Sequence, residues 1–542
     1  MRASRRVAVA VGLLVSCGGD PDDDGHVGFD SDGAADGSAG SESGGDGGGG
    51  GAVSDACPAD PDKDAPGVCG CGIAEDDTDE DGSPDCIDAC PDDANKVEAG
   101  TCGCGVPDAD GDLDGVLDCL DNCSAVANEG QADDDDDGVG DSCDNCAVIP
   151  NPGQDDADAD GTGEACACDP TPIPCSGEPD VTYACDKVEM LARLDLEALD
   201  ASVASDLWGW TSPETGREYA LLGVNHGTVF VDLTYPYCPR HVGTLPTHSG
   251  NGPLRDIKVA GNYAFIVAEA EVHGMQVFDL RRLENAVAPE TFDADAHYAL
   301  FGNAHNLALD PVAGFAYAVG TQTCNGGGPH IIDVTDPLNP AGAGCFSDVG
   351  YVHDAQCLTY AGPDTEHQGK QLCVVFNGGL GSVSVVDMTD KEAIVEISRT
   401  DYSGASFAHQ GWLTEDHAYL LHNDEFDESN GGHFTRTYIW DFRDLDAPEI
   451  IDFYEADSTA TDHNLFTHQG YAYQANYRAG VRIFDLADVA QGELSQVAYF
   501  DTDPTGDGPQ LEGAFSVFPY YASGLMVVSD LSRGVFVLRA EL

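Results

Sequence analysis

The stretch YAFIVAEAEVHGMQVFDL, residues 263–280, decides the fold of the larger part of the chain. Its two apolar segments are separated by polar residues and a glycine, which predicts two antiparallel strands joined by a turn. The second segment ends in an aspartate, and this ending recurs about every 50 residues. The copies are 229–232, 277–279, 331–333, 385–387, 439–441 and 483–485, and a seventh at 535–538 lacks the aspartate.

Groups of about four short strands at such a period are typical of β-propeller blades. Seven groups begin near residues 205, 254, 303, 351, 407, 461 and 513. The last group ends after its third strand, and residues 188–199 have the pattern of the missing fourth strand. We therefore predict an all-β, seven-bladed propeller over residues 181–542, closed by an N-terminal strand that leaves no open sheet edge. A stack of β-sandwiches or a solenoid is the alternative.

The N-terminus carries an export signal. Three arginines in residues 1–6 precede nine apolar residues, 7–15, a length typical of a signal peptide and too short to span a bilayer. The ending Ser16-Cys17 resembles a bacterial lipobox, which implies that Cys17 is acylated and anchors the mature chain. An ordinary cleaved signal with an incidental cysteine is the alternative.

These features divide the N-terminal region. Residues 1–17 are the predicted lipoprotein signal peptide, and residues 18–56 are a disordered tether rich in Gly and Asp. We expect contact with the membrane through the lipid alone. Gly18, where inner-membrane lipoproteins commonly carry Asp, favours the bacterial outer membrane or cell surface.

The strand endings resemble the LVIVD repeat, and the propeller region resembles the choice-of-anchor B family of exported bacterial proteins. The resemblance covers about 350 residues and rests on those endings, on the histidines at several strand starts and on the lipobox. It implies a surface-attached propeller, and it carries no settled activity, because a fold alone does not define a function.

Acidic residues dominate the charge, with 98 Asp and Glu against 22 Lys and Arg. A nucleic-acid partner is excluded, because phosphate binding needs a basic surface. Residues 18–180 contain 46 acidic and 2 basic residues. This segment cannot pack together unless cations neutralise it.

One acidic pattern, D-x-D-x-D-G-x-x-D-x-x-D, recurs four times. Alternating carboxylates before a glycine wrap the chain around a hard cation, and Ca²⁺ takes about six to eight oxygens. The predicted ligands are Asp77, Asp79, Asp81, Asp85 and Asp88; Asp110, Asp112, Asp114, Asp118 and Asp121; Asp133, Asp135, Asp137, Asp141 and Asp144; and Asp156, Asp158, Asp160 and Glu164. A disordered acidic tract with diffuse ion binding is the alternative.

Cysteines flank these copies, and Asp144-Asn145-Cys146 with 151–154 (NPGQ) forms a connector. Residues 57–180 thus resemble thrombospondin type 3 repeats, which implies a calcium-wrapped, disulfide-rich stalk with the pairs Cys123–Cys143 and Cys146–Cys166. Disulfides suit an exported chain. We also expect disulfides among the four cysteines at 324, 345, 357 and 373, with all three pairings open.

Histidines recur at the start of the innermost strand of four successive blades. They are His305, His353, His409 and His463; the alignment gives the same position to Asp256 in the second blade and Ala514 in the seventh, and Asp354 follows His353. These strand starts share one mouth of the ring with the loops between second and third strands. Three or four imidazoles suit Zn²⁺, Cu²⁺ or Fe²⁺. Alternatively, each histidine bonds the backbone of a neighbouring blade.

These features predict a lipid-anchored surface protein whose calcium-binding stalk presents a propeller that binds a protein or glycan. The alternative is a metal-dependent hydrolase or oxidoreductase at the histidine-lined mouth.

Overall fold

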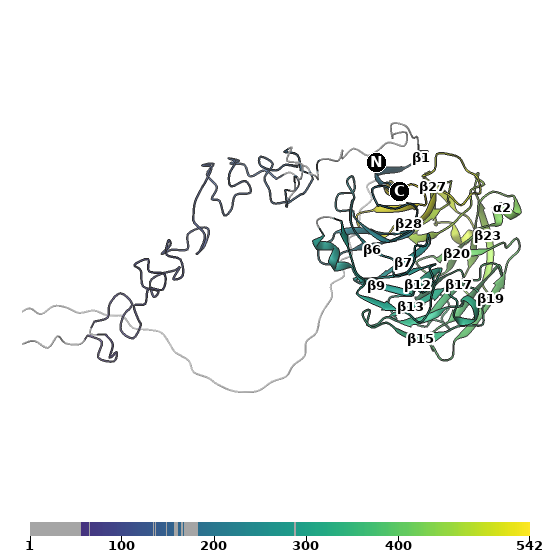
Figure 1. Ribbon diagram of the computed structural model, residues 1–542, viewed down its shortest axis with the longest axis horizontal. Coiled ribbons are helices and arrows are strands. Elements are labelled where there is room, and N and C mark those ends of the chain that lie inside the picture. Colours follow the sequence, from purple (N-terminus) through teal and green to yellow (C-terminus); the bar gives the residue numbers. More distant parts are fainter. Residues whose placement is uncertain are drawn as a thin grey trace, which may run out of the picture. The chain divides into compact units, whose positions relative to one another are not determined.

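Seven sheets form the propeller, and each sheet is one blade (Figure 1). Blade 1 contains β3 (Ala204–Thr211), β4 (Glu218–Val224), β5 (Gly227–Asp232), β6 (Arg240–Pro246) and β10 (Glu290–Thr291). Blade 2 contains β7 (Arg255–Ala260), β8 (Tyr263–Ala268), β9 (Met275–Asp279) and β11 (Ala296–Tyr298). Blade 3 contains β12 (Asn306–Asp310), β13 (Phe315–Val319), β14 (His330–Asp333) and β15 (Ala341–Cys345).

The remaining blades repeat this meander. Blade 4 contains β16 (Asp354–Thr359), β17 (Gln371–Phe376), β18 (Ser382–Asp387) and β19 (Val395–Asp401). Blade 5 contains β20 (Ala408–Leu413), β21 (Tyr419–Asp424), β22 (Arg436–Asp441) and β23 (Glu449–Glu455). Blade 6 contains β24 (Leu465–His468), β25 (Tyr471–Ala475), β26 (Val481–Asp485), β27 (Ser495–Phe500) and β1 (Cys185–Asp186). Blade 7 contains β28 (Ala514–Phe518), β29 (Leu525–Asp530), β30 (Gly534–Ala540) and β2 (Val188–Leu194).

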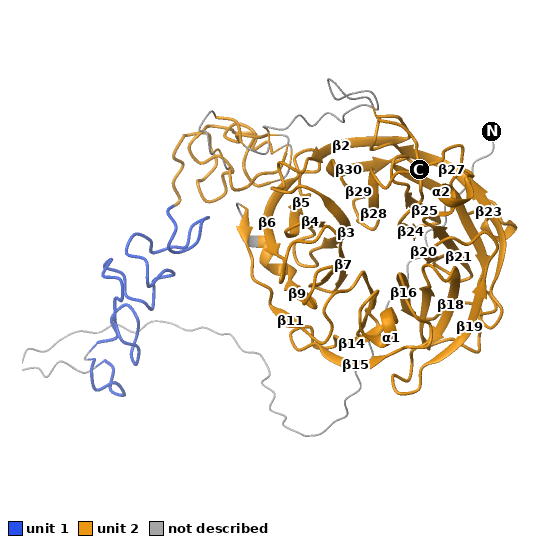
Figure 2. Ribbon diagram, turned by 45° about the vertical axis from the view of Figure 1, so that its right-hand side comes forward, with its two compact units in different colours: residues 1–107 blue, residues 108–542 orange. Residues whose placement is uncertain are grey.

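The computed structural model describes residues 56–63, 65–133, 135, 137–147, 149–154, 156, 161–163, 166, 183–286 and 289–542. The chain divides into two compact units, residues 1–107 and 108–542 (Figure 2). The predicted signal peptide, the lipobox Cys17 and residues 18–55 of the predicted tether lie outside the described residues, as do Asp158, Asp160 and Glu164.

The ring is closed by the N-terminal strand. β2 pairs antiparallel with β30, from Val188 opposite Ala540 to Leu194 opposite Val535, so the last blade combines both ends of the propeller sequence (Figure 2). This confirms the predicted seven-bladed fold and its closure. The sequence did not predict β1, which extends blade 6 by pairing with β27. Short helices connect some strands; they are η2 (Leu280–Asn285), α1 (Cys324–Gly327), α2 (Asp427–Gly431) and η3 (Val489–Gln491).

The apolar core consists of seven clusters, each between two neighbouring blades. Between blades 1 and 2, the rings of Phe230 and Phe278 stack with their centroids 4.7 Å apart, and both are fully buried. Burial of one such side chain stabilises the fold by about 1.5–3 kcal/mol. The blades therefore hold one another in place, and the innermost strands are fixed around the central axis.

The aspartates that end the third strands form turn caps. Oδ1 of Asp232, for example, accepts a hydrogen bond from the amide of Thr234 at 2.8 Å. The same bond to the residue two positions on is made by Asp279, Asp333, Asp387, Asp441 and Asp485. Asp favours such turns because its side chain bonds the backbone.

Disulfides occur in both the acidic segment and the propeller. The propeller contains Cys324–Cys345 and Cys357–Cys373, one of the three possible pairings. The acidic segment contains Cys57–Cys71, Cys69–Cys86, Cys90–Cys104, Cys123–Cys143 and Cys146–Cys166, and the last two are the pairs that the resemblance implies. Within the described ranges, every helix is too short or too polar to cross a membrane.

Candidate functional site

Four histidine side chains form an arc across blades 3 to 6. The ring centroids of His305 and His353 are 4.2 Å apart, those of His353 and His409 are 4.3 Å apart, and those of His409 and His463 are 4.3 Å apart. His353, His409 and His463 are each at most 4% exposed. The predicted row of imidazoles is therefore continuous, and Phe515 of blade 7 follows it, 4.3 Å from His463.

Two of these histidines bond the next blade through Nδ1. Nδ1 of His353 lies 2.9 Å from the carbonyl oxygen of His409, and Nδ1 of His463 lies 2.6 Å from that of Phe515. Because a carbonyl only accepts, Nδ1 donates and Nε2 keeps its lone pair. His353 and His463 thus each bond the backbone of the next blade, as the alternative interpretation expects. The same bonds fix the tautomer in which Nε2 is free to bind a metal.

Glu425 adds a carboxylate to the arc. It lies directly after β21, and its oxygens are 4.0 Å from Nε2 of His409 and 3.8 Å from Nε2 of His463. The hydroxyl of Tyr477 donates to Glu425 at 2.9 Å. His353, His409 and Glu425 each offer one ligand atom, and these atoms lie within 4.8 Å of one another. The geometry therefore fits a small cation held by two imidazoles and one carboxylate.

Burial keeps the imidazoles of His353, His409 and His463 uncharged near neutral pH. It lowers the pKa of His463 to about 3, and burial together with neighbouring imidazoles lowers the pKa values of His353 and His409 well below the ordinary value. Burial also raises the pKa of Glu425 to about 7. Neutral imidazoles are the form that binds metals.

His305 differs from the other three. Its Nδ1 lies 2.7 Å from Oε1 of Glu269, the residue after β8. Burial acts to lower its pKa, but the bond and charge of Glu269 outweigh burial and raise it. His305 therefore holds its proton more tightly than an ordinary histidine, beside Glu269 at the edge of the arc.

The structure places two aligned residues one position away from the prediction. Ala408 of blade 5 and Ala514 of blade 7 each form an isolated bridge with the preceding blade, so they occupy equivalent positions. The residue after Ala408 is His409 and the residue after Ala514 is Phe515, so Phe515 occupies the histidine position of blade 7. Asp256 of blade 2 and Asp354 of blade 4 each accept a hydrogen bond from the amide of the following residue, so they occupy equivalent positions. Arg255 is therefore equivalent to His353 and occupies the histidine position of blade 2. The histidine repeat is broken in these blades, so the sequence offered no marker for the register.

Asp256 and Asp354 belong to a second polar group along the innermost strands. The ammonium of Lys258 contacts Asp256 and lies 3.8 Å from Asp206. Burial raises the pKa of Asp354 to about 7, while the charge of Lys258 acts to lower it. Lys258 thus interacts with three carboxylates, those of Asp206, Asp256 and Asp354.

A cavity of about 310 Å³ lies at the other ends of these strands. Trp208, Lys258, Gln356, Trp412 and His417 contribute its aromatic and polar lining. Trp412 follows His409 by three residues, which is about 10 Å along a strand. The histidine arc and this cavity therefore lie at opposite ends of the innermost strands.

The acidic repeats fold into one recurring turn. The amides of Gly82, Gly115, Gly138 and Gly161 donate to the first Asp of their own copy, and all four glycines have φ between 88° and 100°. A positive φ of this kind favours glycine. The ligand atoms of Asp77, Asp79 and Asp81, and those of Asp110, Asp112 and Asp114, lie within 4.8 Å of one another.

Several buried oxygens in these turns have no hydrogen-bond partner in the described part of the chain. Both oxygens of Asp135 are in this state, as is one oxygen each of Asp77, Asp79, Asp88, Asp112, Asp121 and Asp144. Burial, followed by the charges of Asp137 and Asp144, raises the pKa of Asp135 to about 6. Carboxylates without donors are the ligands that hard cations require, so the residues fit metal binding.

The connector also folds regularly. The amide of Asn145 donates to Oε1 of Gln154 at 2.8 Å, and Nε2 of Gln154 donates to Asp144 at 2.7 Å. The amide of Asn151 donates to Oδ2 of Asp137 at 2.6 Å. These bonds hold the third acidic turn against its connector.

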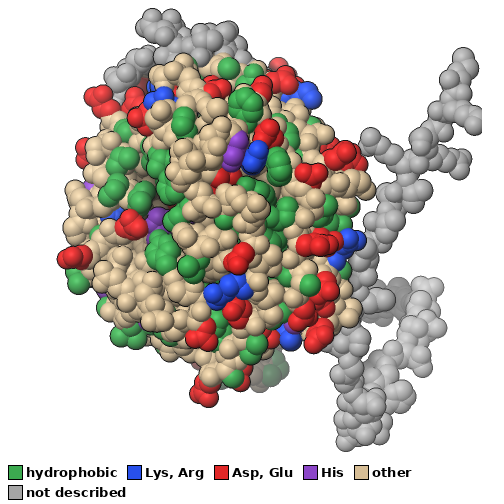
Figure 3. All heavy atoms as spheres, turned by 90° about the vertical axis from the view of Figure 1, so that its right-hand side faces the viewer, with side chains coloured by type: hydrophobic (Ala, Val, Ile, Leu, Met, Phe, Trp, Pro, Cys, Tyr) green, Lys and Arg blue, Asp and Glu red, His purple; other side chains and the backbone are tan. Residues whose placement is uncertain are grey.

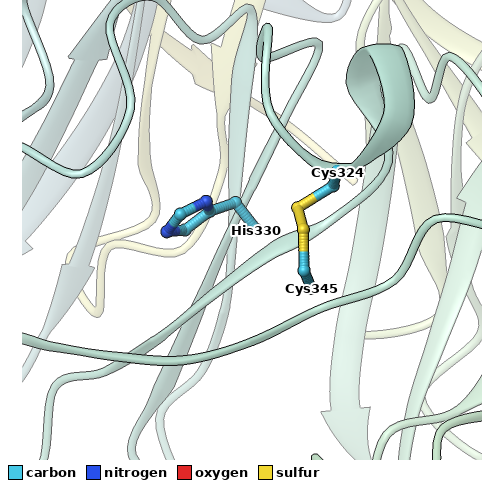
Figure 4. Close-up of side chains that lie close together, drawn as sticks. All are labelled: Cys324, His330 and Cys345. Atoms are coloured by element: carbon cyan, nitrogen blue, oxygen red, sulfur yellow. A yellow bond between two sulfur atoms is a disulfide. The ribbon is translucent and has the colours of Figure 1, made fainter.

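A third grouping carries no metal chemistry. Cys324, His330 and Cys345 lie close together (Figure 4), but the two sulfurs form a disulfide and are not thiolates. Nε2 of His330 bonds Tyr298 and Nδ1 bonds Thr323, which fully occupies the ring.

Together the fold and these groups define a class: a seven-bladed β-propeller protein with an acidic, disulfide-rich N-terminal segment. No protein-family model and no curated protein matches the chain. A solved structure of a protein from Lactobacillus plantarum is 14% identical, with 60% of this chain and 88% of that chain covered and a TM-score of 0.41.

Two further solved structures are similar. A periplasmic gluconolactonase of Pseudomonas aeruginosa is 10% identical, with 56% of this chain and 86% of that chain covered and a TM-score of 0.41. A functionally unknown protein from Desulfotomaculum acetoxidans is 9% identical, with 57% and 90% covered and a TM-score of 0.40.

Proposed function

We propose that the chain is an exported, lipid-anchored bacterial surface protein that binds a glycan through its propeller. Cys17 would anchor it at the outer membrane or cell surface, and calcium-binding repeats of the thrombospondin type 3 kind would form its stalk. The LVIVD-type strand endings support a place in the choice-of-anchor B family. The orphaned carboxylate oxygens of the acidic turns support calcium as the stalk cation.

The cavity beside Trp208 and Trp412 carries the binding proposal. Both indoles are half-buried, whereas Trp210 and Trp440 are buried in the core. Indole faces suit the apolar faces of sugar rings, and Lys258, Gln356 and His417 supply polar contacts around them. On the surface, acidic side chains lie in separate small groups on the face drawn in Figure 3. Such a surface favours a neutral or basic partner.

The test measures tryptophan fluorescence of the full chain during titration with a panel of neutral oligosaccharides. Trp412→Ala should weaken binding at least tenfold, and Trp412→Phe should weaken it less, because a smaller aromatic face remains. Phe434→Ala removes a side chain that is 45% exposed and lies outside the cavity lining, so it should bind like the wild type. Saturable binding that Trp412→Ala leaves unchanged would contradict the cavity as the site.

The histidine arc supports a second candidate, a metal-dependent enzyme at the opposite mouth. His353, His409 and Glu425 would hold Zn²⁺, Cu²⁺ or Fe²⁺, and a free coordination position would allow metal-assisted hydrolysis or oxidation. Metal analysis of the full chain tests this candidate. One transition-metal ion per chain should be lost in His409→Ala and retained in His417→Ala; a metal-free wild type after reconstitution would refute the site.

A further inference from the structure

The loop that follows Glu425 buries two more acidic side chains. Asp427 and Glu428 begin α2, and they are 1% and 3% exposed. Asp462, which precedes β24 of blade 6, is 0% exposed. We call these three residues the inter-blade carboxylate cluster, because blade 5 supplies two of them and the entry to blade 6 supplies the third.

This cluster lacks the donors that buried carboxylates need. Both oxygens of Asp462, both oxygens of Glu428 and Oδ1 of Asp427 accept no hydrogen bond of ordinary length among the described residues, although the backbone amides of Glu428 and Arg436 act to lower the pKa of Glu428. The remaining oxygen of Asp427 accepts from the hydroxyl of Tyr438 at 2.9 Å. Leaving buried ionised groups without partners costs several kcal/mol each, so the cluster as it stands is incomplete.

The neighbouring Asp424 is a buried carboxylate that has a full set of hydrogen-bond donors. It is also 0% exposed, but it accepts from the Tyr402 hydroxyl at 2.6 Å and from the amides of Ser406 and Phe407 at 2.8 and 2.6 Å. The end of β21 therefore contains a carboxylate with a full set of hydrogen-bond donors, and the loop after it contains two carboxylates, three and four residues later, without such a set. Tight packing alone does not explain the difference.

The charges of the three carboxylates act on one another. Burial and then the charges of Glu428 and Asp427 raise the pKa of Asp462 well above the ordinary value. Burial and the charge of Asp427 raise the pKa of Glu428 to about 9. Nε2 of His433 lies 3.7 Å from Oδ2 of Asp427, the oxygen that also accepts from Tyr438. Arg436 is paired with Glu455.

We propose that Asp427, Glu428 and Asp462 bind one Ca²⁺ ion, or a similar hard divalent cation, between blades 5 and 6. The ligand atoms are all oxygens, which hard cations prefer and softer transition metals do not. The buried hydroxyl of Thr461, which also has no partner in the described structure, adds a further oxygen beside Asp462. The cation would tie α2 to blade 6 and so fix the loop that carries Glu425 of the histidine arc.

The position of the aromatic residues makes this site separately measurable in the full chain. Residues 57–182 contain no Phe, Tyr or Trp, so the acidic repeats supply no aromatic sensitiser of their own for a bound Tb³⁺ ion, a luminescent substitute for Ca²⁺. Tyr438 bonds the cluster directly, and Trp440 lies two residues further along β22. The part of the sensitised emission that Glu428→Gln and Asp462→Asn remove therefore reports on the inter-blade carboxylate cluster, whether or not the stalk binds calcium.

The experiment titrates Tb³⁺ into the full chain, excites the aromatic residues and then displaces Tb³⁺ with Ca²⁺. We expect saturable emission that Ca²⁺ reverses, and at least tenfold weaker binding in Glu428→Gln and in Asp462→Asn. The control Asp390→Asn changes an exposed carboxylate and should bind like the wild type. Tryptophan emission checks the fold of each variant.

A second measurement separates a cation site from a pair of protonated carboxyl groups. Ca²⁺ should raise the melting temperature of the propeller, followed by tryptophan fluorescence, in the wild type and not in Glu428→Gln. In EDTA, Glu428→Gln should melt higher than the wild type, because it removes one of the repelling groups. Absent emission, or emission and a calcium effect that both variants retain, would overturn the proposal.

Discussion

Replacing Asp354 by Asn should stabilise the propeller at alkaline pH and leave its stability nearly unchanged in acid. Asp354 is partly buried beside Asp256 and Lys258, and its pKa is raised from 3.8 to about 7. Asn keeps an oxygen for the amide of Ala355, which bonds Asp354 at 2.6 Å. The substitution therefore removes the charge and retains the shape and the hydrogen bond.

The sign follows from proton linkage. Between pH 3.8 and about 7 the folded protein binds the Asp354 proton more tightly than the unfolded chain does, so the stability falls as the pH rises and the loss is complete above about pH 7. A pKa difference of about three corresponds to roughly 4 kcal/mol. Because the side chain is partly accessible to water, we expect a gain of about 2–3 kcal/mol for Asp354→Asn at pH 8 and close to zero at pH 4.

Urea unfolding in EDTA, followed by tryptophan fluorescence, measures this difference. All four tryptophans lie in the propeller, so the acidic segment does not contribute to the signal. The midpoint should move with an unchanged slope, since the surface exposed on unfolding stays the same. An equal effect at both pH values, or a loss of stability at pH 8, would refute the assignment of a costly buried charge to Asp354.

Three other outcomes test the fold and the stalk. Met190→Ala, in the closing strand β2, should lower the free energy of unfolding by about 2–4 kcal/mol, because the side chain is 1% exposed. The control Glu189→Ala changes a half-buried side chain of the same strand and should have little effect. Equal urea midpoints for the two variants would contradict closure by β2. Asp333→Ala should cost about 1 kcal/mol through the lost turn cap, and urea unfolding of this variant beside Asp348→Ala, a change at an exposed side chain, would reveal it. Ca²⁺ should protect residues 57–168 from proteolysis, and EDTA should leave the propeller folded; a stalk cleaved equally fast in both conditions would contradict calcium binding there.

The repeat in the sequence was sufficient to predict the blades. Strand endings such as 277–279 mark every blade, and the displaced strand at 188–199 follows from the missing fourth strand of blade 7. The arc from His305 to His463 was predictable because one residue type recurs at one position. Arg255 and Phe515 interrupt that repeat, so the alignment placed Asp256 and Ala514 one residue away, and a one-residue slip turns a strand side chain to the opposite face.

The sequence predicts Glu425 at the same mouth as the histidines, in a loop between a second and a third strand, but its contact with His409 could not be predicted in the same way. It lies in a loop, and its approach to His409 depends on the conformation of that loop rather than on a strand period. The same reason applies to Asp462, whose neighbours Asp427 and Glu428 are more than 30 residues earlier in the sequence. Sequence spacing identifies residues that a repeat brings together, but not residues that meet through irregular segments.

Hydrogen-bond donors, rather than charge alone, separate the roles of the acidic residues. Asp232 and Asp424 receive backbone amides, so their carboxylates stabilise turns and need no cation. Asp135 in the acidic repeats and Asp462 in the propeller are alike in having two buried oxygens without donors in the described structure. Because the formal charge of −76 counts all of them equally, it overstates the charge that solvent meets wherever a bound cation completes such a group. The described residues of the acidic repeats form no apolar core comparable to the seven inter-blade clusters, so cation binding should determine whether these repeats fold. In the propeller, cation binding should adjust one loop of a ring that apolar packing already holds.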